Sequence, residues 1–307
     1  MQSKKNPIKL ASNDEKLLKR YGFKIGEPLN SGSFACVCRA TFKSEPCAAK
    51  VIDLERTSED YRIKFLPREI YTMKKLKHKY LIEILDIFVV GNRVIVFMEL
   101  ADGGDFLDFL HENQSPLSED RCRYFYKQFG DALCYMHSKG FAHRDIKCEN
   151  ILLNKERTIS KLTDYGFTRT CLERNSGQGL MSNTYCGSTA YVAPEVLKSQ
   201  PYNPLISDVW SMGVVMYVLL NNRLPFPERD TKKLLRDQLN QSYRFVKTIS
   251  KQCQDLISLH LNPNPSTRIT MNEIFQHEWF GEQKNSFDCY DRIERNDIES
   301  QSKISDI

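Results

Sequence analysis

Two patterns along the chain predict an α+β fold in two parts. Residues 22 to 55 alternate short apolar and β-branched stretches with turn residues, and Arg93 to Leu100 forms a further strand-like run. From Ser115 onward, apolar residues recur at helical spacing instead. We therefore expect a small, strand-rich N-terminal part and a larger, helix-rich C-terminal part with a cleft between them.

The N-terminal part should be a small antiparallel sheet with one helix. Its strands are the runs just named, and the helix is expected at about Pro67 to Lys77. Proline suits the first turn of a helix, and Ile70 and Met73 mark one apolar face. A short connection from Glu99 to Gly104 then joins this part to the next one.

The C-terminal part should contain a long helix that begins after Ser118. The serine suits the N-cap position, Glu119 and Asp120 favour the first turn, and Gly140 closes the helix. Further along, the apolar segment from Trp210 to Leu220 predicts a hydrophobic helix. We expect the polar run at residues 143 to 150 to rest on it.

Composition is typical of a globular protein. Of the 307 residues, 41% are hydrophobic and 27% are charged, and the longest apolar run, Val214 to Leu220, is far below the roughly 20 residues of a membrane span. The N-terminus has no apolar targeting segment, and the ten cysteines are scattered, so we expect reduced thiols. These features predict a cytoplasmic protein with no membrane partner.

Charge argues against nucleic acid as a partner. The net charge of +5 is spread along the chain without a basic tract. The tail from 281 to 307 has four basic and seven acidic residues, hence a net charge of −3. We expect this tail and about the first 20 residues to lack folded structure.

A stretch of polar residues carries the chemistry. His143-Arg144-Asp145-Ile146-Lys147-Cys148-Glu149-Asn150 is followed, fourteen residues beyond its asparagine, by Asp164-Tyr165-Gly166. Phosphoryl transfer has a loose transition state, so a protein contributes chiefly charge neutralisation and alignment. Asp145 can accept the proton of a substrate hydroxyl, and Lys147 can offset charge on the phosphoryl group. Asn150 and Asp164 supply hard oxygen ligands for Mg²⁺.

With these motifs in order, the chain resembles the eukaryotic protein-kinase domain from about Tyr21 to Phe280. The segments Lys64 to Ile70 and Thr184 to Ser188, and Cys148 in the catalytic loop, are similar to the testis-specific serine/threonine kinases. The resemblance implies a bilobal protein-kinase fold. Its expected parts are an N-terminal extension at 1–20, an N-lobe at 21–98, a hinge at 99–104, a C-lobe at 105–280 and an acidic polar tail at 281–307.

The resemblance also implies ATP and Mg²⁺ as cofactors. Lys50 would hold the α- and β-phosphates and pair with Glu69, while Gly32 remains in the hairpin that covers the phosphates. Asn150 and Asp164 would hold the metal, Asp164 also counting among the nucleotide contacts. The remaining expected nucleotide contacts are Leu29, Val37, Ala48, Met98, Glu99, Ala101, Asp105 and Leu152.

A long loop rich in small polar residues, Phe167 to Val192, is the activation loop by resemblance. Thr184 takes the place of the activating phosphothreonine, so an upstream activating kinase is an expected partner. Arg144 and Arg169 would pair with its phosphate.

Two further features follow from the resemblance. Ser188 together with Lys147 matches the serine/threonine-specific branch. Beyond the loop, Glu195 would form a buried ion pair with Arg268 that ties the loop to the helices.

We therefore predict a serine/threonine protein kinase with protein substrates. Glu149 and Asp105 would form an acidic patch that selects arginine three residues upstream of the acceptor, whereas Val218 stands where basophilic relatives have another acid. Two alternatives stay open. One alternative is a pseudokinase that binds nucleotide or a client protein. It is favoured by the phosphate-covering hairpin, which keeps only Gly32 where the family usually has three glycines, and by Tyr165, where the family usually has phenylalanine. A small-molecule kinase is disfavoured, because the long loop shapes a platform for a peptide.

Overall fold

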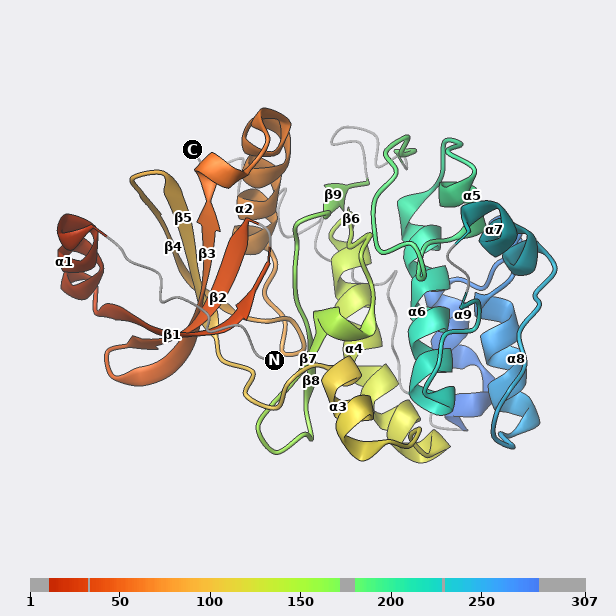
Figure 1. The fold of residues 1–307 in the computed structure, drawn as a ribbon. Coiled ribbons are helices and arrows are strands. Elements are labelled where there is room, and N and C mark those ends of the chain that lie inside the picture. The colour runs from red at the N-terminus through yellow and green to blue at the C-terminus, as the bar shows by residue number, and fades with distance from the viewer. Residues whose placement is uncertain (1–10, 33, 172–179, 228–229, 282–307) are drawn as a thin grey trace, which may run out of the picture. The chain divides into compact units, whose positions relative to one another are not determined.

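The computed structural model describes residues 11–32, 34–171, 180–227 and 230–281, and the chain divides into two compact units, Met1–Asp102 and Gly103–Ile307. The first unit is built on a five-stranded sheet, and the second holds most of the helices (Figure 1). The predicted α+β class, strand-rich first and helix-rich second, is confirmed.

The sheet of the first unit is antiparallel throughout, in the order β1-β2-β3-β5-β4. Its strands are β1 (Phe23–Ser31), β2 (Ala35–Phe42), β3 (Glu45–Asp53), β4 (Ile84–Val90) and β5 (Arg93–Glu99). One face buries an apolar cluster in which the ring of Phe23 stacks on that of Phe97, with centroids 4.0 Å apart. Alternate residues of β3 and of β5 belong to this cluster, because successive side chains of a strand point to opposite faces of the sheet.

The expectation that about the first 20 residues lack folded structure is wrong for Ser12–Arg20, which form helix α1. Leu18 on this helix is 1% exposed and belongs to the apolar cluster of the sheet. No side chain caps the start of α1, and most of its residues are polar. Burial of Leu18 therefore fixes the helix to the sheet, while acidic residues in its first turn and basic residues in its last turn favour the helix locally. Residues 1–10 and the tail 282–307 lie outside the described residues.

The predicted helix near Pro67 begins earlier than expected. A 3-10 turn, Leu54–Arg56, follows β3, and a π-helical turn, Tyr61–Phe65, leads directly into α2, Leu66–Lys75. The helix ends two residues before the predicted Lys77, because Leu76 is already extended with φ −91° and ψ 121°.

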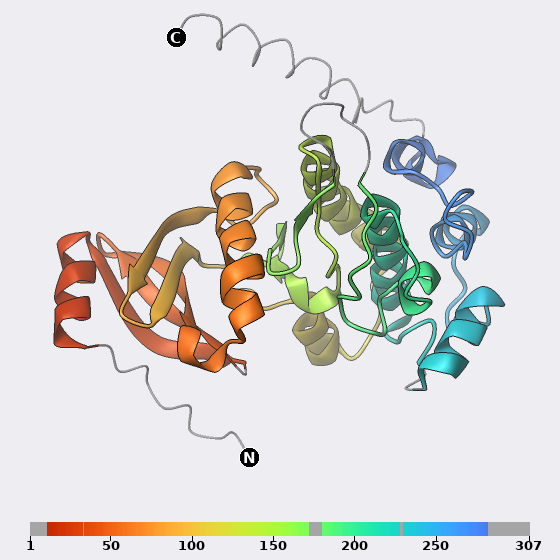
Figure 2. The ribbon, with the colours of Figure 1, turned by 90° about the horizontal axis from the view of Figure 1, so that it is seen from above.

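The second unit packs its helices around α6. Its helices are α3 (Phe106–Asn113), α4 (Glu119–Ser138), α5 (Pro194–Leu197), α6 (Pro204–Asn221), α7 (Thr231–Leu239), α8 (Lys251–His260) and α9 (Met271–Gln276). In both views α6 runs beside α4 (Figures 1 and 2). The predicted cap of α4 is confirmed, since Ser118 Oγ accepts a hydrogen bond from Arg121 N at 3.3 Å.

Helix α6 has the length and apolarity that a membrane span requires, alone among the described helices, but 89% of it is buried inside the protein. This burial is expected of a helix at the centre of a folded core.

Eight cysteines of the described chain are free thiols, as expected, and seven of them are buried.

Two short pairs of antiparallel strands lie next to the candidate site in the sequence. Strand β6 (Phe141–Ala142) pairs with β9 (Arg169–Thr170), and β7 (Ile151–Leu153) pairs with β8 (Ser160–Leu162). The polar run from residue 143 to residue 150 lies between β6 and β7 in sequence, so both of its ends are fixed by strand pairing.

Candidate active site

The carboxylate of Asp145 is the centre of a dense polar cluster in the second unit. Its Oδ1 accepts hydrogen bonds from Ser188 N at 3.0 Å and Ser188 Oγ at 3.1 Å. Its Oδ2 accepts from Asn150 Nδ2 at 3.0 Å and lies 2.8 Å from Lys147 Nζ. Lys147 Nζ also donates to Ser188 Oγ at 2.9 Å. The structure thus brings together Asp145, Lys147 and Asn150, and adds Ser188 from the activation loop.

Asp208 on α6 anchors the backbone of the catalytic run, the polar segment from residue 143 to residue 150. This carboxylate is 1% exposed and accepts from His143 N at 2.8 Å and Arg144 N at 2.7 Å. His137 Nε2 lies 2.9 Å from the same carboxylate. The sequence predicted a scaffold role for the motif that Asp208 opens and that the run would rest on this helix, but it did not predict these hydrogen bonds. A lone carboxylate within an apolar helix was the available signal, because burial of a charge demands such partners.

His143 has a structural position. Its Nδ1 accepts from Asp145 N at 3.3 Å, and its Nε2 lies 2.9 Å from the carbonyl oxygen of Thr163. The imidazole therefore ties the catalytic run to the segment that precedes Asp164. Tyr165 is also buried, with its ring centroid 6.4 Å from that of His143.

Asn150 and Asp164 stand at the open end of the β7–β8 hairpin. Asn150 precedes β7, Asp164 follows β8 by two residues, and Thr163 N donates to Asn150 O at 3.0 Å. The amide nitrogen of Asn150 donates to Asp145, which leaves the amide oxygen as its acceptor atom. Asp164 has a left-handed backbone, with φ 67°. One amide oxygen and one carboxylate form a hard donor set that fits Mg²⁺.

This donor set is small. Among the described residues, no group of three or more histidine, cysteine, aspartate or glutamate side chains could hold a metal ion. Magnesium commonly takes one or two protein ligands and fills its other positions with water and phosphate oxygens. Asn150 and Asp164 suit that manner of binding.

In the first unit, Lys50 and Glu69 form the predicted ion pair. Lys50 Nζ lies 3.0 Å from Glu69 Oε1, and Glu69 is 1% exposed. Val37 lies opposite Lys50 in the sheet register, and Ala48 lies opposite Met98. Because paired residues share a face of the sheet, these three predicted nucleotide contacts lie on the face of Lys50.

The other predicted contacts of the first unit lie at the ends of strands. Gly32 N donates to Ala35 O at 2.8 Å, which closes the hairpin between β1 and β2, and Leu29 on β1 is 37% exposed. Glu99 ends β5, and its N–H donates to Glu83 O at 3.0 Å. Ala101 follows without regular secondary structure.

Asp105 and Leu152 belong to the second unit, where they form a single antiparallel bridge. Asp105 Oδ1 accepts from Asp108 N at 2.9 Å and caps α3. Burial raises the pKa of Asp105, and the negative charges of Asp108 and Glu149 add to the shift. Glu149 Oε2 is buried without a hydrogen-bond partner in the described structure. The two predicted patch residues are therefore electrostatic neighbours.

Arg144 already holds the activation loop. Its guanidinium donates to Phe167 O at 2.6 Å and to Ser182 Oγ at 3.2 Å. Ser182 is fully buried and exchanges backbone hydrogen bonds with Tyr202 at 2.8 and 3.0 Å. Thr184 is exposed. The sequence did not predict the role of Ser182, since only the fold brings it to Arg144.

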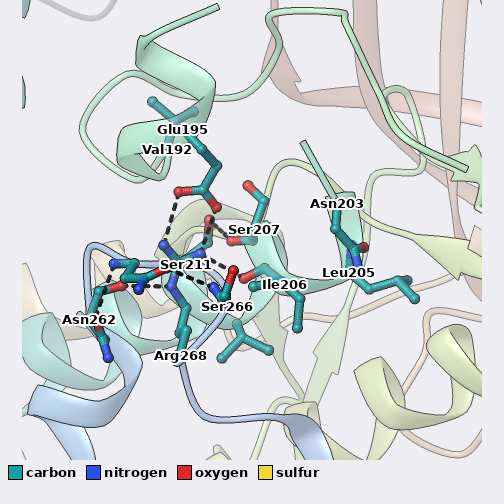
Figure 3. Close-up of polar contacts among 12 residues, drawn as sticks. Val192, Glu195, Asn203, Leu205, Ile206, Ser207, Ser211, Asn262, Ser266 and Arg268 are labelled. Carbon is teal, nitrogen blue, oxygen red and sulfur yellow. Dashed lines mark hydrogen bonds and ion pairs between the residues drawn. The ribbon is translucent and has the colours of Figure 1, made fainter. Parts of the chain in front are cut away.

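The predicted pairing of Arg169 with a phosphate falls on a side chain outside the described residues, although its backbone pairs with Ala142. By contrast, the predicted ion pair between Glu195 and Arg268 is confirmed (Figure 3). Two nearly parallel bonds of 2.7 and 2.9 Å join the buried side chains. Arg268 also donates to Asn262 O and Ile206 O, so the pair is fully supported by hydrogen bonds.

Comparison with known proteins agrees with this arrangement. The family model of the protein kinase domain matches residues 23–280. Testis-specific serine/threonine-protein kinase 1 of Mus musculus is 38% identical over 272 residues, which cover 87% of this chain and 74% of the relative. Testis-specific serine/threonine-protein kinase 3 of Homo sapiens is 38% identical over 269 residues, which cover 86% and 98%.

A plant relative is more distant. CBL-interacting protein kinase 32 of Oryza sativa subsp. japonica is 34% identical over 268 residues, which cover 86% of this chain and 60% of the relative. The family model and these relatives span the catalytic run and both groups of site residues. The chain therefore belongs to the protein kinase domain family, has testis-specific serine/threonine kinases among its relatives, and is a protein serine/threonine kinase.

Proposed function

We propose that this kinase transfers the γ-phosphate of Mg-ATP to serine and threonine hydroxyls of proteins. The observation that carries the proposal is the Asp145 carboxylate, which is held by Lys147, Asn150 and Ser188 at 2.8 to 3.1 Å. A fixed carboxylate beside a cation is what alignment of a hydroxyl against a phosphoryl group requires.

Each group of the second unit has a proposed role. Asp145 orients the substrate hydroxyl and accepts its proton, and Lys147 offsets negative charge on the transferred phosphoryl group. Asn150 and Asp164 would hold Mg²⁺, which protein kinases generally use with ATP. When bound, the ion neutralises charge on the phosphate oxygens.

The first unit is proposed to hold the nucleotide. Lys50, oriented by Glu69, would bind the α- and β-phosphates. Val37, Ala48 and Met98 share its face of the sheet and would contact the adenine. The other proposed contacts are Leu29, Gly32, Glu99 and Ala101 in this unit, and Asp105, Leu152 and Asp164 in the second unit.

A pseudokinase is the competing proposal. Gly32 stands alone in the phosphate-covering hairpin, and Tyr165 departs from the usual phenylalanine. Against this alternative, Lys50 and Glu69 are paired and Asp145 is bonded to Asn150. A dead site usually lacks at least one of these groups, so we favour transfer.

Two substitutions test the proposal. Lys50→Met and Asp164→Asn should each lower transfer of radiolabelled phosphate to a generic basic protein by about 100-fold or more, because each removes a charge used at the phosphates. The matched control is Lys64→Met, whose lysine is 58% exposed and pairs with Asp60 on the surface. Retention of more than about a tenth of wild-type turnover in both site variants would overturn the assignment.

Phosphorylation of Thr184 is proposed to raise activity. A dianion there would add charge-assisted hydrogen bonds to Arg144, whose guanidinium already holds the loop through Ser182. After treatment with an activating kinase, Thr184→Ala should turn over a serine peptide more slowly than the wild type. Equal turnover would place the switch elsewhere.

Substrate preference is proposed to rest on Glu149 and Asp105. Glu149 is partly exposed and its charge acts on Asp105, so together the two residues suit a guanidinium from arginine three residues upstream of the acceptor. Val218 is 4% exposed and apolar, so an arginine two residues upstream of the acceptor finds no acidic partner there. Glu149→Ala should erode the preference in a peptide array. Selection of proline-directed or acidic sequences by the wild type would refute this specificity.

A further inference from the structure

The Glu69 carboxylate has a second partner besides Lys50. Tyr61 OH donates to Glu69 Oε2 at 2.9 Å, while Lys50 Nζ donates to Oε1 at 3.0 Å. Glu69 is 1% exposed, so water has little access to either oxygen. A buried carboxylate with only one oxygen hydrogen-bonded is costly, and the hydroxyl of Tyr61 removes that cost.

The π-helical turn explains how Tyr61 reaches Glu69. The two residues are eight positions apart, and in a regular α-helix eight residues overshoot two full turns by about 80°. The π turn at Tyr61–Phe65 rotates the chain less per residue, because its hydrogen bonds close wider rings. The two side chains are thereby brought towards one face of the helix. Such turns are often found at functional sites.

The position of Tyr61 is fixed from two further directions. Its N–H donates to Ser58 Oγ at 3.2 Å, and the neighbouring Arg62 donates to Leu54 O at 2.6 Å, beyond the end of β3. Its ring lies 5.3 Å from the ring of Phe34, centroid to centroid, at 51°. Phe34 belongs to the glycine hairpin that begins at Gly32. Tyr61 therefore contacts both the ion pair and the hairpin.

We propose that Tyr61 is a positioning residue for the Lys50–Glu69 pair, with its hydroxyl orienting the carboxylate and its ring seating Phe34 of the glycine hairpin. The inference rests on the proposed function, in which Lys50 binds the phosphates of ATP. Without the hydroxyl, Glu69 Oε2 loses its bond and the carboxylate is free to turn away from Lys50. The proposed result is a lysine held less firmly against the phosphates, while the peptide site is untouched.

The first test is Tyr61→Phe, which deletes the hydroxyl and keeps the ring against Phe34. We expect kcat/KM for ATP to fall about tenfold, the scale of a lost hydrogen bond to a charged group, while KM for the peptide stays unchanged. The matched control is Tyr71→Phe, since Tyr71 lies on α2 and is 45% exposed. The control should keep the wild-type kcat/KM for ATP. A value for Tyr61→Phe within about twofold of the wild type would overturn the proposal.

A double-mutant cycle with Glu69→Ala separates positioning from a general structural effect. If Tyr61 acts through Glu69, Tyr61→Phe has no further effect on kcat/KM for ATP in the Glu69→Ala background. An equal loss in both backgrounds, or a loss matched by a fall in melting temperature, would overturn the proposal.

Lys50→Met keeps this test distinct from that of the proposed function. If Lys50→Met transfers phosphate as well as the wild type, the proposed function fails. If Lys50→Met is inactive and Tyr61→Phe equals the wild type, only the role of Tyr61 fails.

Discussion

A single methyl group at Gly187 should separate the activation loop from Asp145. Gly187 has φ 96°, and a Cβ there would lie 2.7 Å from the carbonyl oxygen of Arg144 and 3.1 Å from Val192 Cγ1. The carbonyl has little room to move, because Arg144 N is bonded to the buried Asp208. Ser188, the next residue, makes both loop contacts to Asp145.

The size of the effect follows from these contacts. A left-handed backbone costs a non-glycine residue roughly 1–2 kcal/mol. Crowding of a packed site costs about 1–3 kcal/mol more. The loop can relieve both by moving away from Arg144, at the expense of the Ser188 bonds. Even about 2 kcal/mol favours that movement by about 30-fold, so Gly187→Ala should lower kcat/KM for a peptide by at least this factor.

Steady-state turnover of a serine peptide, with the melting temperature measured in parallel, tests this expectation. Gly91→Ala is the matched control, since Gly91 also has positive φ, at 52°, but a Cβ there meets only Asp14 Oδ2 at 3.8 Å. The control should keep wild-type activity. If Gly187→Ala retains kcat/KM within about threefold of wild type, the coupling of loop and carboxylate is not as described.

Two further predictions concern groups that the chemistry does not use directly. Burial lowers the pKa of His260 from 6.5 to about 3, so the unfolding free energy should fall as the pH drops below about 6.5 towards 3 and be insensitive to this group above it. His260→Gln should flatten that part of a urea-denaturation profile taken against pH, and an unchanged slope would contradict the assignment. Ser182→Ala should lower turnover about fivefold before Thr184 is phosphorylated, because Arg144 loses a hydrogen bond to the loop. Phosphorylation of Thr184 should restore the turnover of this variant. Equal turnover of variant and wild type before phosphorylation would refute this role.

Local patterns were sufficient to predict the groups that lie close together in sequence. Asp145, Lys147 and Asn150 occupy six consecutive positions, so their proximity requires only the correct loop. The resemblance to the family, rather than a local pattern, assigned Lys50 and Val37 to one site, and the sheet register places the two residues opposite each other.

Contacts between distant segments could not be predicted in this way. Asp208 lies 65 residues beyond His143, and Ser182 lies 38 residues beyond Arg144. Helix α1 was not predicted, because its sequence has only two apolar residues, Leu17 and Leu18, too few to show a helical repeat. The bond from Tyr61 to Glu69 depends on a π turn, which an apolar repeat does not reveal.

The central claim is that Asp145 acts in phosphoryl transfer on a protein hydroxyl. The most direct measurement compares wild type and Asp145→Asn in single-turnover transfer of labelled phosphate from Mg-ATP to a serine peptide, with nucleotide affinity measured on the same samples. We predict transfer by the wild type, wild-type nucleotide affinity in the variant, and a rate lowered by at least about 100-fold. Nucleotide binding without transfer by the wild type, or equal rates for both proteins, would contradict the claim.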